Sequence, residues 1–274
     1  MPEPLLDTRA GPPSLDPAVL GRALLETDRR YFELGAIRRE LRGAELLWLE
    51  GMADLPAAGV VHRVVPAETV DSAAWVGEVT AALLDTGFRR GRIYLDAPFV
   101  PLEAQLASDG WTMRREPGLV ALANVPRRTP DIQLIPVLGD DDWTAKERVH
   151  QADAIRPDGH DAPASRWVAT EQVRVATGEL DAWLVIREGI VCGTVCTMAD
   201  DIVLRNKNLV VHPDHRRTGV GLGVLAKLDD MARDRGLVLG TFSVAGEEGA
   251  LLYRAADMSV VVEQREWSRP LEST

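Results

Sequence analysis

The segment Val211–Gly223 (VHPDHRRTGVGLG) constrains the fold of this 274-residue chain more than any other. It follows an apolar run at 202–211 that has the length of a strand, and it leads into 222–235, where apolar residues recur at helical spacing. Glycines let a backbone turn tightly and bring successive amides into one concavity, and a helix start adds unpaired N–H groups. A strand, a glycine-rich turn and a helix in this order predict an anion site, most naturally for a pyrophosphate.

Two common phosphate-binding motifs do not fit this segment. The dinucleotide fingerprint requires Gly-x-Gly-x-x-Gly, whereas the glycines here are Gly219, Gly221 and Gly223. A P-loop ends in Gly-Lys-Ser or Gly-Lys-Thr, which this segment lacks. The positive charge beside the turn comes from Arg216 and Arg217, and it has to be local because the chain as a whole carries a net charge of −11.

Composition excludes several other functional classes. Acidic residues outnumber basic ones 42 to 31, so the chain lacks the basic surface that nucleic-acid binding through phosphates requires. No apolar run approaches the roughly 20 residues of a membrane-spanning helix, and the first residues do not resemble a signal peptide. The only cysteines, Cys192 and Cys196, exclude a disulfide framework and favour a cytoplasmic location. Because they are four residues apart in one predicted strand, we expect both on the same side in apolar packing, with no metal site.

A segment with prolines and arginines divides the chain into two α/β halves. We expect a leader at 1–17, a first domain at 18–125, a linker at 126–130 and a second domain at 131–274. The second domain is predicted as β–α–α–β–β–β–α–β–α–β, a mixed α/β pattern. In the first domain the predicted helices are 17–42, 72–86 and 101–108, and the predicted strands are 44–49, 59–65, 92–95, 111–113 and 119–124.

A weak internal repeat relates the two halves. Residues 81–111 resemble residues 226–258, since both contain a helix, an Arg-Gly pair, a strand, a short helix and a turn into a strand. The two stretches are either unrelated or copies of one fold, and we favour the second interpretation. The first copy has no glycine- and arginine-containing turn ahead of its helix at 72–86, so it is expected to be degenerate.

At the glycine-rich turn 211–223, the second half resembles the GNAT family of N-acetyltransferases. That family's acyl-CoA signature is Arg/Gln-x-x-Gly-x-Gly/Ala after a strand that ends in Val-x-Pro. Here Arg216-Arg-Thr-Gly219-Val-Gly221 matches it, with Val211-His-Pro213 upstream. The resemblance covers about residues 131–268. It implies tandem GNAT-like folds, each a twisted mixed sheet flanked by helices, with a degenerate N-terminal copy and an active C-terminal copy.

The resemblance also implies which residues form the site. The loop amides of Arg217, Thr218, Gly219, Val220, Gly221 and Leu222, beside Arg216, would hold the pyrophosphate of acetyl-CoA or another acyl-CoA. The strand end at Leu209, Val210 and Val211 would pair with the pantetheine arm, and the Leu209 amide would stabilise the oxyanion. Leu252-Tyr253 matches the family's late Leu-Tyr pair, so Tyr253 is the expected general acid toward the leaving thiolate.

Departures from the family pattern leave the chemistry less defined than the binding. Asp257-Met258 stands where Gly-Phe is usual, and Arg205 stands where a glutamate often acts as base. Asp200, Asp201 or a water chain remain candidates for the base. The leading hypothesis is transfer of an acetyl group to a primary amine of a small molecule by a monomer or homodimer. The alternatives are a non-catalytic acyl-CoA sensor, or an acyltransferase that uses a carrier-protein-bound acyl group.

Overall fold

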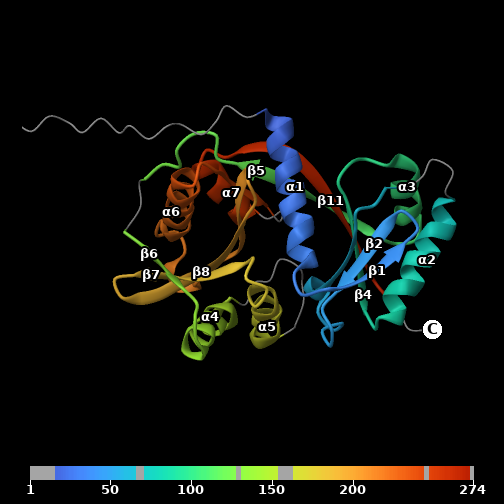
Figure 1. Cartoon of the computed structure of the whole chain (residues 1–274), viewed down its shortest axis with the longest axis horizontal. Helices are drawn as coiled ribbons and strands as arrows, with labels where there is room; N and C mark the ends of the chain where they lie inside the picture. Colours follow the sequence, from blue (N-terminus) through green and yellow to red (C-terminus); the bar gives the residue numbers. More distant parts are fainter. Residues whose placement is uncertain (1–15, 66–70, 128–130, 154–162, 244–246, 272–274) are drawn as a thin grey trace, which may run out of the picture.

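The computed structural model describes residues 16–65, 71–127, 131–153, 163–243 and 247–271 (Figure 1). Most of the expected leader at 1–17 and the end of the expected linker at 126–130 therefore lie outside the described residues. The first helix begins at Pro17, and the Asp16 carboxylate caps it by accepting a bond from the Ala18 amide.

A single mixed sheet of 11 strands runs through both halves of the described chain (Figure 1). Its strands are β1 (Ile37–Leu41), β2 (Ala44–Trp48), β3 (Gly59–His62), β4 (Arg90–Leu95), β5 (Thr112–Val120), β6 (Gln133–Pro136), β7 (Asp181–Arg187), β8 (Ile190–Ala199), β9 (Val203–Val211), β10 (Val238–Phe242) and β11 (Ser259–Pro270). The helices are α1 (Pro17–Glu33), α2 (Ser72–Asp85), α3 (Val100–Ser108), α4 (Asp140–Ala152), α5 (Ala164–Val175), α6 (Val220–Asp234) and α7 (Glu247–Ala255), with 3-10 turns η1 (Pro56–Ala58) and η2 (Pro213–His215).

The two halves exchange their last strands. The sheet order is β1-β2-β3-β4-β11-β5-β10-β9-β8-β7-β6, so the C-terminal strand β11 lies between β4 and β5 of the first half. Reciprocally, β5 of the first half pairs antiparallel with β10 of the second half. The expected α/β fold is present, but the sheets of the two copies are fused into one through this exchange.

Buried polar bonds fasten the exchanged strand on both sides. The Glu266 carboxylate on β11 accepts bonds from Arg92 (2.7 Å) and the Tyr94 hydroxyl (2.8 Å) on β4. It also accepts one from Arg114 on β5 at 2.8 Å. Burial alone would raise the pKa of Glu266, but the guanidiniums of Arg92 and Arg114 outweigh this effect and hold the pKa below its usual value. The carboxylate is therefore charged at neutral pH.

The helix ends repeat between the halves as the internal similarity suggests. Helix α2 is followed by Gly87 (φ 83°) and α6 by Gly236 (φ 71°). In each case the next amide, of Phe88 or Leu237, bonds back into the last helical turn. The two halves therefore use the same stop to turn the chain from a helix into a parallel strand.

The backbone bonds that end α3 and α7 are also equivalent, and they show where the sequences of the two halves differ. After α3, the Trp111 amide donates to the Leu106 carbonyl, and after α7 the Met258 amide donates to the Tyr253 carbonyl. Leu106 thus occupies the position of Tyr253. A leucine cannot transfer a proton, which supports the interpretation that the first copy is degenerate.

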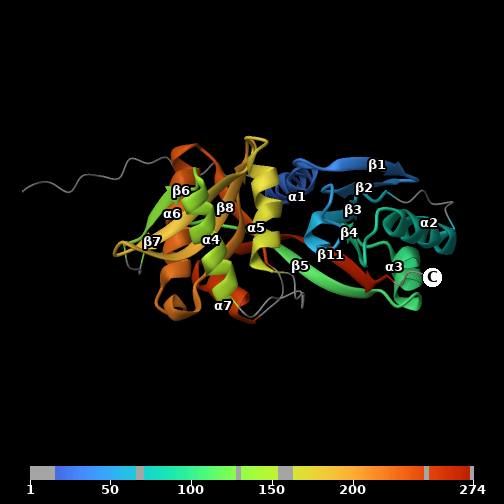
Figure 2. The same cartoon turned by 90° about the horizontal axis from the view of Figure 1, so that it is seen from below.

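Helices cover both faces of the sheet. On β9, Leu204 packs in the cluster beneath α6, whereas the adjacent Val203 packs with Leu20 and Leu24 of α1 on the opposite face. Helices α2, α3 and α7 lie on the α6 side, and α4 and α5 lie on the α1 side. Helix α1 crosses the middle of the sheet, and its C-terminal end meets the C-terminal end of α5 (Figure 2). There the Arg174 side chain donates to the Tyr31 carbonyl.

Three local predictions from the sequence are wrong in detail. The predicted helix at 17–42 ends at Glu33, because Gly35 turns the chain at φ 68° into the exposed strand β1. The predicted strands at 111–113 and 119–124 are the single strand β5. Cys192 and Cys196 lie on opposite faces, since Cys192 is an extra residue of β8 between Val191 and Gly193, which pair with the consecutive β7 residues Ile186 and Val185, and this bulge reverses the alternation. Both thiols are buried and free, which agrees with the expected packing role.

Among the described residues, no helix combines the length and the apolar character that crossing a bilayer requires.

The strand exchange predicts that the second half does not fold by itself. A fragment of residues 131–274 would leave β11 without its neighbours β4 and β5, and β10 without β5. We expect this fragment to be unfolded or aggregated by circular dichroism and size-exclusion chromatography. Co-expression with residues 1–127 should restore a soluble complex. A cooperative thermal transition of the isolated fragment would contradict this prediction.

Candidate active site

Strands β9 and β10 diverge beside the sequence motif. They pair in parallel through Val203, Leu204 and Arg205, opposite Val238, Leu239 and Gly240. Beyond this point β9 continues to Val211, and the described residues show no further pair with β10. One edge of β9 is therefore open, and backbone groups along that edge can bind an extended ligand.

A bulge in β9 sets which amides face the open edge. Asn208 has φ 54°, and the pairing with β8 shifts register around it. The His212 amide donates to the Cys192 carbonyl of β8 at 2.9 Å. Since amides alternate in direction along a strand, those of Leu209 and Val211 point away from β8, toward the open edge. Of the expected pantetheine partners, Leu209 and Val211 thus present their amides on this edge, whereas the Val210 amide points toward β8.

The glycine-rich turn delivers the start of α6 to the same place. Gly219 is the N-cap in the left-handed conformation (φ 88°), and no side chain caps the helix. The first described backbone bond of the helix runs from the Gly223 amide to the Gly219 carbonyl (2.9 Å). The amides of Val220, Gly221 and Leu222 have no acceptor within the helix and remain available to an anion. The helix begins at Val220, before the predicted Leu222.

The arginines of the motif differ in their surroundings. Arg216 donates to the Val211 carbonyl (3.1 Å) and to Asp153, beyond α4 (2.7 Å). This arrangement ties the strand end to the turn and partly neutralises the Arg216 charge. Arg217 is exposed and has φ 59°. A third cation was missed by sequence reasoning, since Arg187 from the end of β7 donates to the Thr218 hydroxyl (3.3 Å).

Helix α7 packs close against the first turn of α6. A Cβ added to Gly221 would lie 3.3 Å from both δ carbons of Leu252, so even an alanine here would require the Leu252 side chain to shift. Leu252 and Tyr253 both contact the core cluster beneath α6. The second glycine of the motif therefore positions the helix that carries the expected acid.

Tyr253 lies where β9 and β10 begin to separate. Burial raises the pKa of its phenol, while polar contacts with Thr241 on β10 and Asn206 on β9 partly oppose this shift. Asn206 is 1% exposed, and its side-chain amide has no hydrogen-bond partner among the described residues apart from this contact with the Tyr253 hydroxyl. The amide therefore keeps hydrogen-bonding capacity for a ligand that reaches this junction. Sequence reasoning did not single out Asn206 or Thr241.

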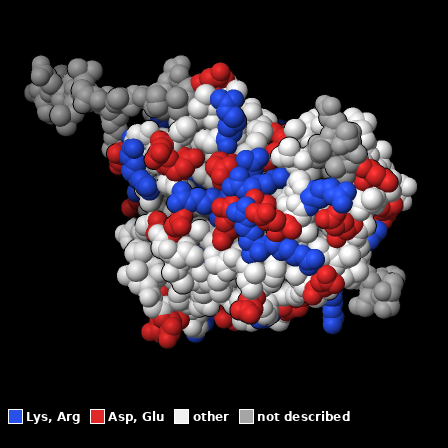
Figure 3. Space-filling view, turned by 45° about the vertical axis from the view of Figure 1, so that its right-hand side comes forward, with Lys and Arg blue, Asp and Glu red and all other residues white. Residues whose placement is uncertain are grey.

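The position of the family's glutamate faces the other side of the sheet. Arg205 is 1% exposed and pairs with the Asp28 carboxylate of α1. Burial alone would raise the pKa of Asp28, but the charges of Arg205 and Lys207 outweigh it and hold the pKa below its usual value. On the surface, Figure 3 shows acidic and basic side chains intermixed over the middle of the molecule.

The other candidate bases lie far from this junction. Asp200 accepts bonds from the Ile202 and Val203 amides (2.7 and 2.6 Å), and it thereby shapes the turn between β8 and β9. Asp201 lies in the same turn, at the opposite end of β9 from Leu209. At about 3.3 Å per strand residue, the separation is on the order of 25 Å. We therefore do not retain either aspartate as a base.

Comparisons with known proteins identify the fold. No protein-family model matches the sequence, and no curated protein matches it. The structure is similar to a conserved Staphylococcus epidermidis protein of unknown function (TM-score 0.65, 11% identity, 87% of this chain and 96% of that chain). It is similar to a GCN5-related N-acetyltransferase from Kribbella flavida (TM-score 0.61, 17% identity, 92% of this chain and 95% of that chain). It also resembles a tandem GNAT protein from the clavulanic acid biosynthesis pathway (TM-score 0.56, 14% identity, 84% of this chain and 79% of that chain). The GNAT-like fold expected from the motif is thus confirmed.

The buried ion pair beneath the site predicts a large effect on stability. Asp28→Asn would leave Arg205 charged and uncompensated, so we expect the free energy of unfolding to fall by about 3–5 kcal/mol in urea denaturation at pH 7. Because the pKa of Asp28 is lowered in the folded state, this effect should shrink as the pH falls through that lowered pKa. The double variant Asp28→Leu, Arg205→Met should recover much of the loss. An equally unstable double variant would contradict the interpretation.

Proposed function

We propose that the chain is an acyl-CoA-dependent N-acyltransferase that moves an acetyl group from acetyl-CoA to a primary amine of a small molecule by direct attack. The observation that carries the proposal is the open edge of β9, which meets the uncapped start of α6 and the partly buried phenol of Tyr253. Each of these three features supplies one requirement of the reaction, namely an extended binding edge, an anion site and a proton donor.

The residues at the turn fit a coenzyme A pyrophosphate. The amides of Val220, Gly221 and Leu222 would donate to its oxygens, together with those of Arg217, Thr218 and Gly219 before them. The side chains of Arg187 and Arg217 would add positive charge, whereas Arg216 would act mainly by holding the turn against β9. The backbone at Leu209, Val210 and Val211 would align the pantetheine arm, with the amides of Leu209 and Val211 on the open edge.

The chemistry assigned to the protein follows from two groups. The Leu209 amide would donate to the carbonyl oxygen as negative charge develops there, which stabilises the tetrahedral state. The raised pKa of Tyr253 keeps its hydroxyl protonated at neutral pH, so it can donate a proton to the departing sulfur. Arg205 cannot accept a proton from the amine, and we assign that proton to solvent. Holding both reactants in one site would supply much of the remaining acceleration.

A second candidate function is binding without catalysis. Arg205 stands where the family often has a glutamate, and its guanidinium forms an ion pair with Asp28. The absence of a base at this position favours an acyl-CoA sensor. A transferase that takes its acyl group from a carrier protein is a related alternative, in which the nucleotide-binding turn would matter little. Acetyl-CoA turnover with a panel of small amines separates these possibilities, because only a transferase releases free thiol in an amine-dependent way. Mass spectrometry of the purified protein would detect a retained CoA thioester.

The turn predicts a binding defect that leaves the fold intact. Gly219→Asp would add a negative charge and a side chain at φ 88°, so acetyl-CoA should no longer raise the melting temperature. Gly178→Asp is the matched control, because Gly178 has φ 80° and open space around it but lies outside the turn. Unchanged stabilisation of the Gly219 variant by acetyl-CoA would exclude the assigned pyrophosphate site.

The phenol predicts a catalytic defect without a binding defect. Tyr253→Phe removes the proton donor but keeps the ring that packs beneath α6, so kcat should fall by about 100-fold or more. Thermal stabilisation by acetyl-CoA should stay close to that of the wild-type protein. A variant with normal kcat would show that Tyr253 serves only in packing, and a wild-type protein that releases no thiol with any amine would favour the sensor.

A further inference from the structure

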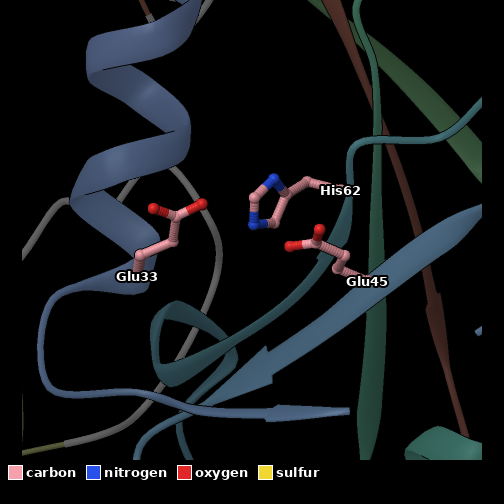
Figure 4. Close-up of side chains that lie close together, drawn as sticks. All are labelled: Glu33, Glu45 and His62. Atoms are coloured by element: carbon pink, nitrogen blue, oxygen red, sulfur yellow. The ribbon is translucent and has the colours of Figure 1, made fainter. Parts of the chain in front are cut away.

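Three potential metal ligands meet in the first half of the chain, away from the proposed active site. They are Glu33 at the end of α1, Glu45 on β2 and His62 on β3, and their ligand atoms all lie within 4.8 Å of one another. Figure 4 shows the His62 ring between the two carboxylates, with one ring nitrogen turned toward the gap between them. Strands β2 and β3 are adjacent, and α1 crosses this face of the sheet, so three separate elements bring the groups together.

His62 is the unusual member of this group. It is 2% exposed, and neither of its ring nitrogens has a hydrogen-bond partner among the described residues. Burial, aided by the nearby Arg63 guanidinium, lowers the pKa of His62 to about 4, so the ring is neutral at pH 7. A neutral imidazole has a lone pair on one ring nitrogen. When the ring is buried and this lone pair accepts no hydrogen bond, the free energy of the folded state rises.

The two carboxylates are anchored but not saturated. Glu33 accepts two bonds from Arg63, at 2.8 and 3.1 Å. Glu45 accepts a bond from Arg38 through one oxygen at 2.6 Å, while its other oxygen has no hydrogen-bond partner and lies 3.6 Å from Arg63. Glu26 adds a third carboxylate to the same arginine at 2.9 Å. The arginines Arg29, Arg38 and Arg63 share these three carboxylates, and the second oxygen of Glu45 stays unpaired beside the unpartnered imidazole.

We propose that Glu33, Glu45 and His62 form a binding site for a divalent transition-metal ion of the Zn²⁺ type. One imidazole nitrogen with two carboxylates is a ligand set that such ions accept, whereas Mg²⁺ and Ca²⁺ prefer sites made of oxygen alone. The ion would take the lone pair of His62 and the unpaired oxygen of Glu45. Glu33 is 33% exposed at its side chain, which leaves a route by which the ion enters.

The site would stabilise the fold and take no part in acyl transfer. In the sheet order β3 and β9 are separated by β4, β11, β5 and β10, which at about 4.8 Å per strand is on the order of 24 Å. An ion held by α1, β2 and β3 would fix the C-terminal end of α1 against the adjacent strands β2 and β3. The proposal is therefore independent of the proposed acyltransferase function.

The first test is binding of Zn²⁺ to the full-length protein after treatment with a chelator and removal of any affinity tag. Competition with a chromophoric chelator should show one equivalent bound, and Zn²⁺ should raise the melting temperature while Mg²⁺ and Ca²⁺ at the same concentration do not. Absence of Zn²⁺ binding to the wild-type protein would overturn the proposal.

Variants then assign the ion to its ligands. His62→Gln and Glu33→Gln should each weaken Zn²⁺ binding by about tenfold or more, and the second variant keeps the test valid if the first does not fold. Arg63→Gln should tighten binding, because it removes the cation that competes for both carboxylates. His215→Ala is the control, since His212 and His215 lie near each other on the active-site turn. Zn²⁺ binding that is lost in the control and retained in the Glu33 and His62 variants would overturn the proposal.

Discussion

The pairing of β11 between β4 and β5 is the constraint on which the rest of the structure depends. It places the last strand of each half on the neighbouring half and fuses two small sheets into one. This exchange leaves β10 paired with β5 on one side, so that β10 can separate from β9 on the other without losing its place in the sheet. The opening at the proposed active site therefore relies on a strand from the first half of the chain.

The charged layer beneath α1 follows from the same exchange. Strands from both halves meet at the middle of the sheet, and each contributes ionisable residues to this face. Glu266 binds Arg92 and Arg114 there, and Arg205 binds Asp28. Buried ion pairs of this kind contribute little net free energy compared with apolar packing, but breaking one is costly. They therefore favour one arrangement of the strands over the alternatives.

Features set by neighbouring residues could be predicted from the sequence, whereas features that depend on distant strands could not. The turn at 211–223, the Asp71 cap of α2 and the stop at Gly236 depend on residues within a few positions, and the structure has the turn and both helix ends where expected. The family resemblance named Tyr253 as a candidate, and this stays a prediction, whereas no sequence pattern pointed to its neighbours Asn206 and Thr241, which come from two other elements. No pattern announces the strand exchange, because antiparallel pairing between β5 and β11 joins residues nearly 150 positions apart. Bulges have the same effect locally, since the bulge of β8 at Cys192, opposite Val185 and Ile186 of β7, puts Cys192 and Cys196 on opposite faces.

The position of β11 also has a consequence for the order of events during synthesis. Residues 259–270 leave the ribosome after every other described strand, yet they complete the sheet of the half that was made first. Until they emerge, the facing edges of β4 and β5 have no strand to pair with and stay exposed. A chain truncated before residue 259 would therefore be defective in both halves and exposed to cellular proteases.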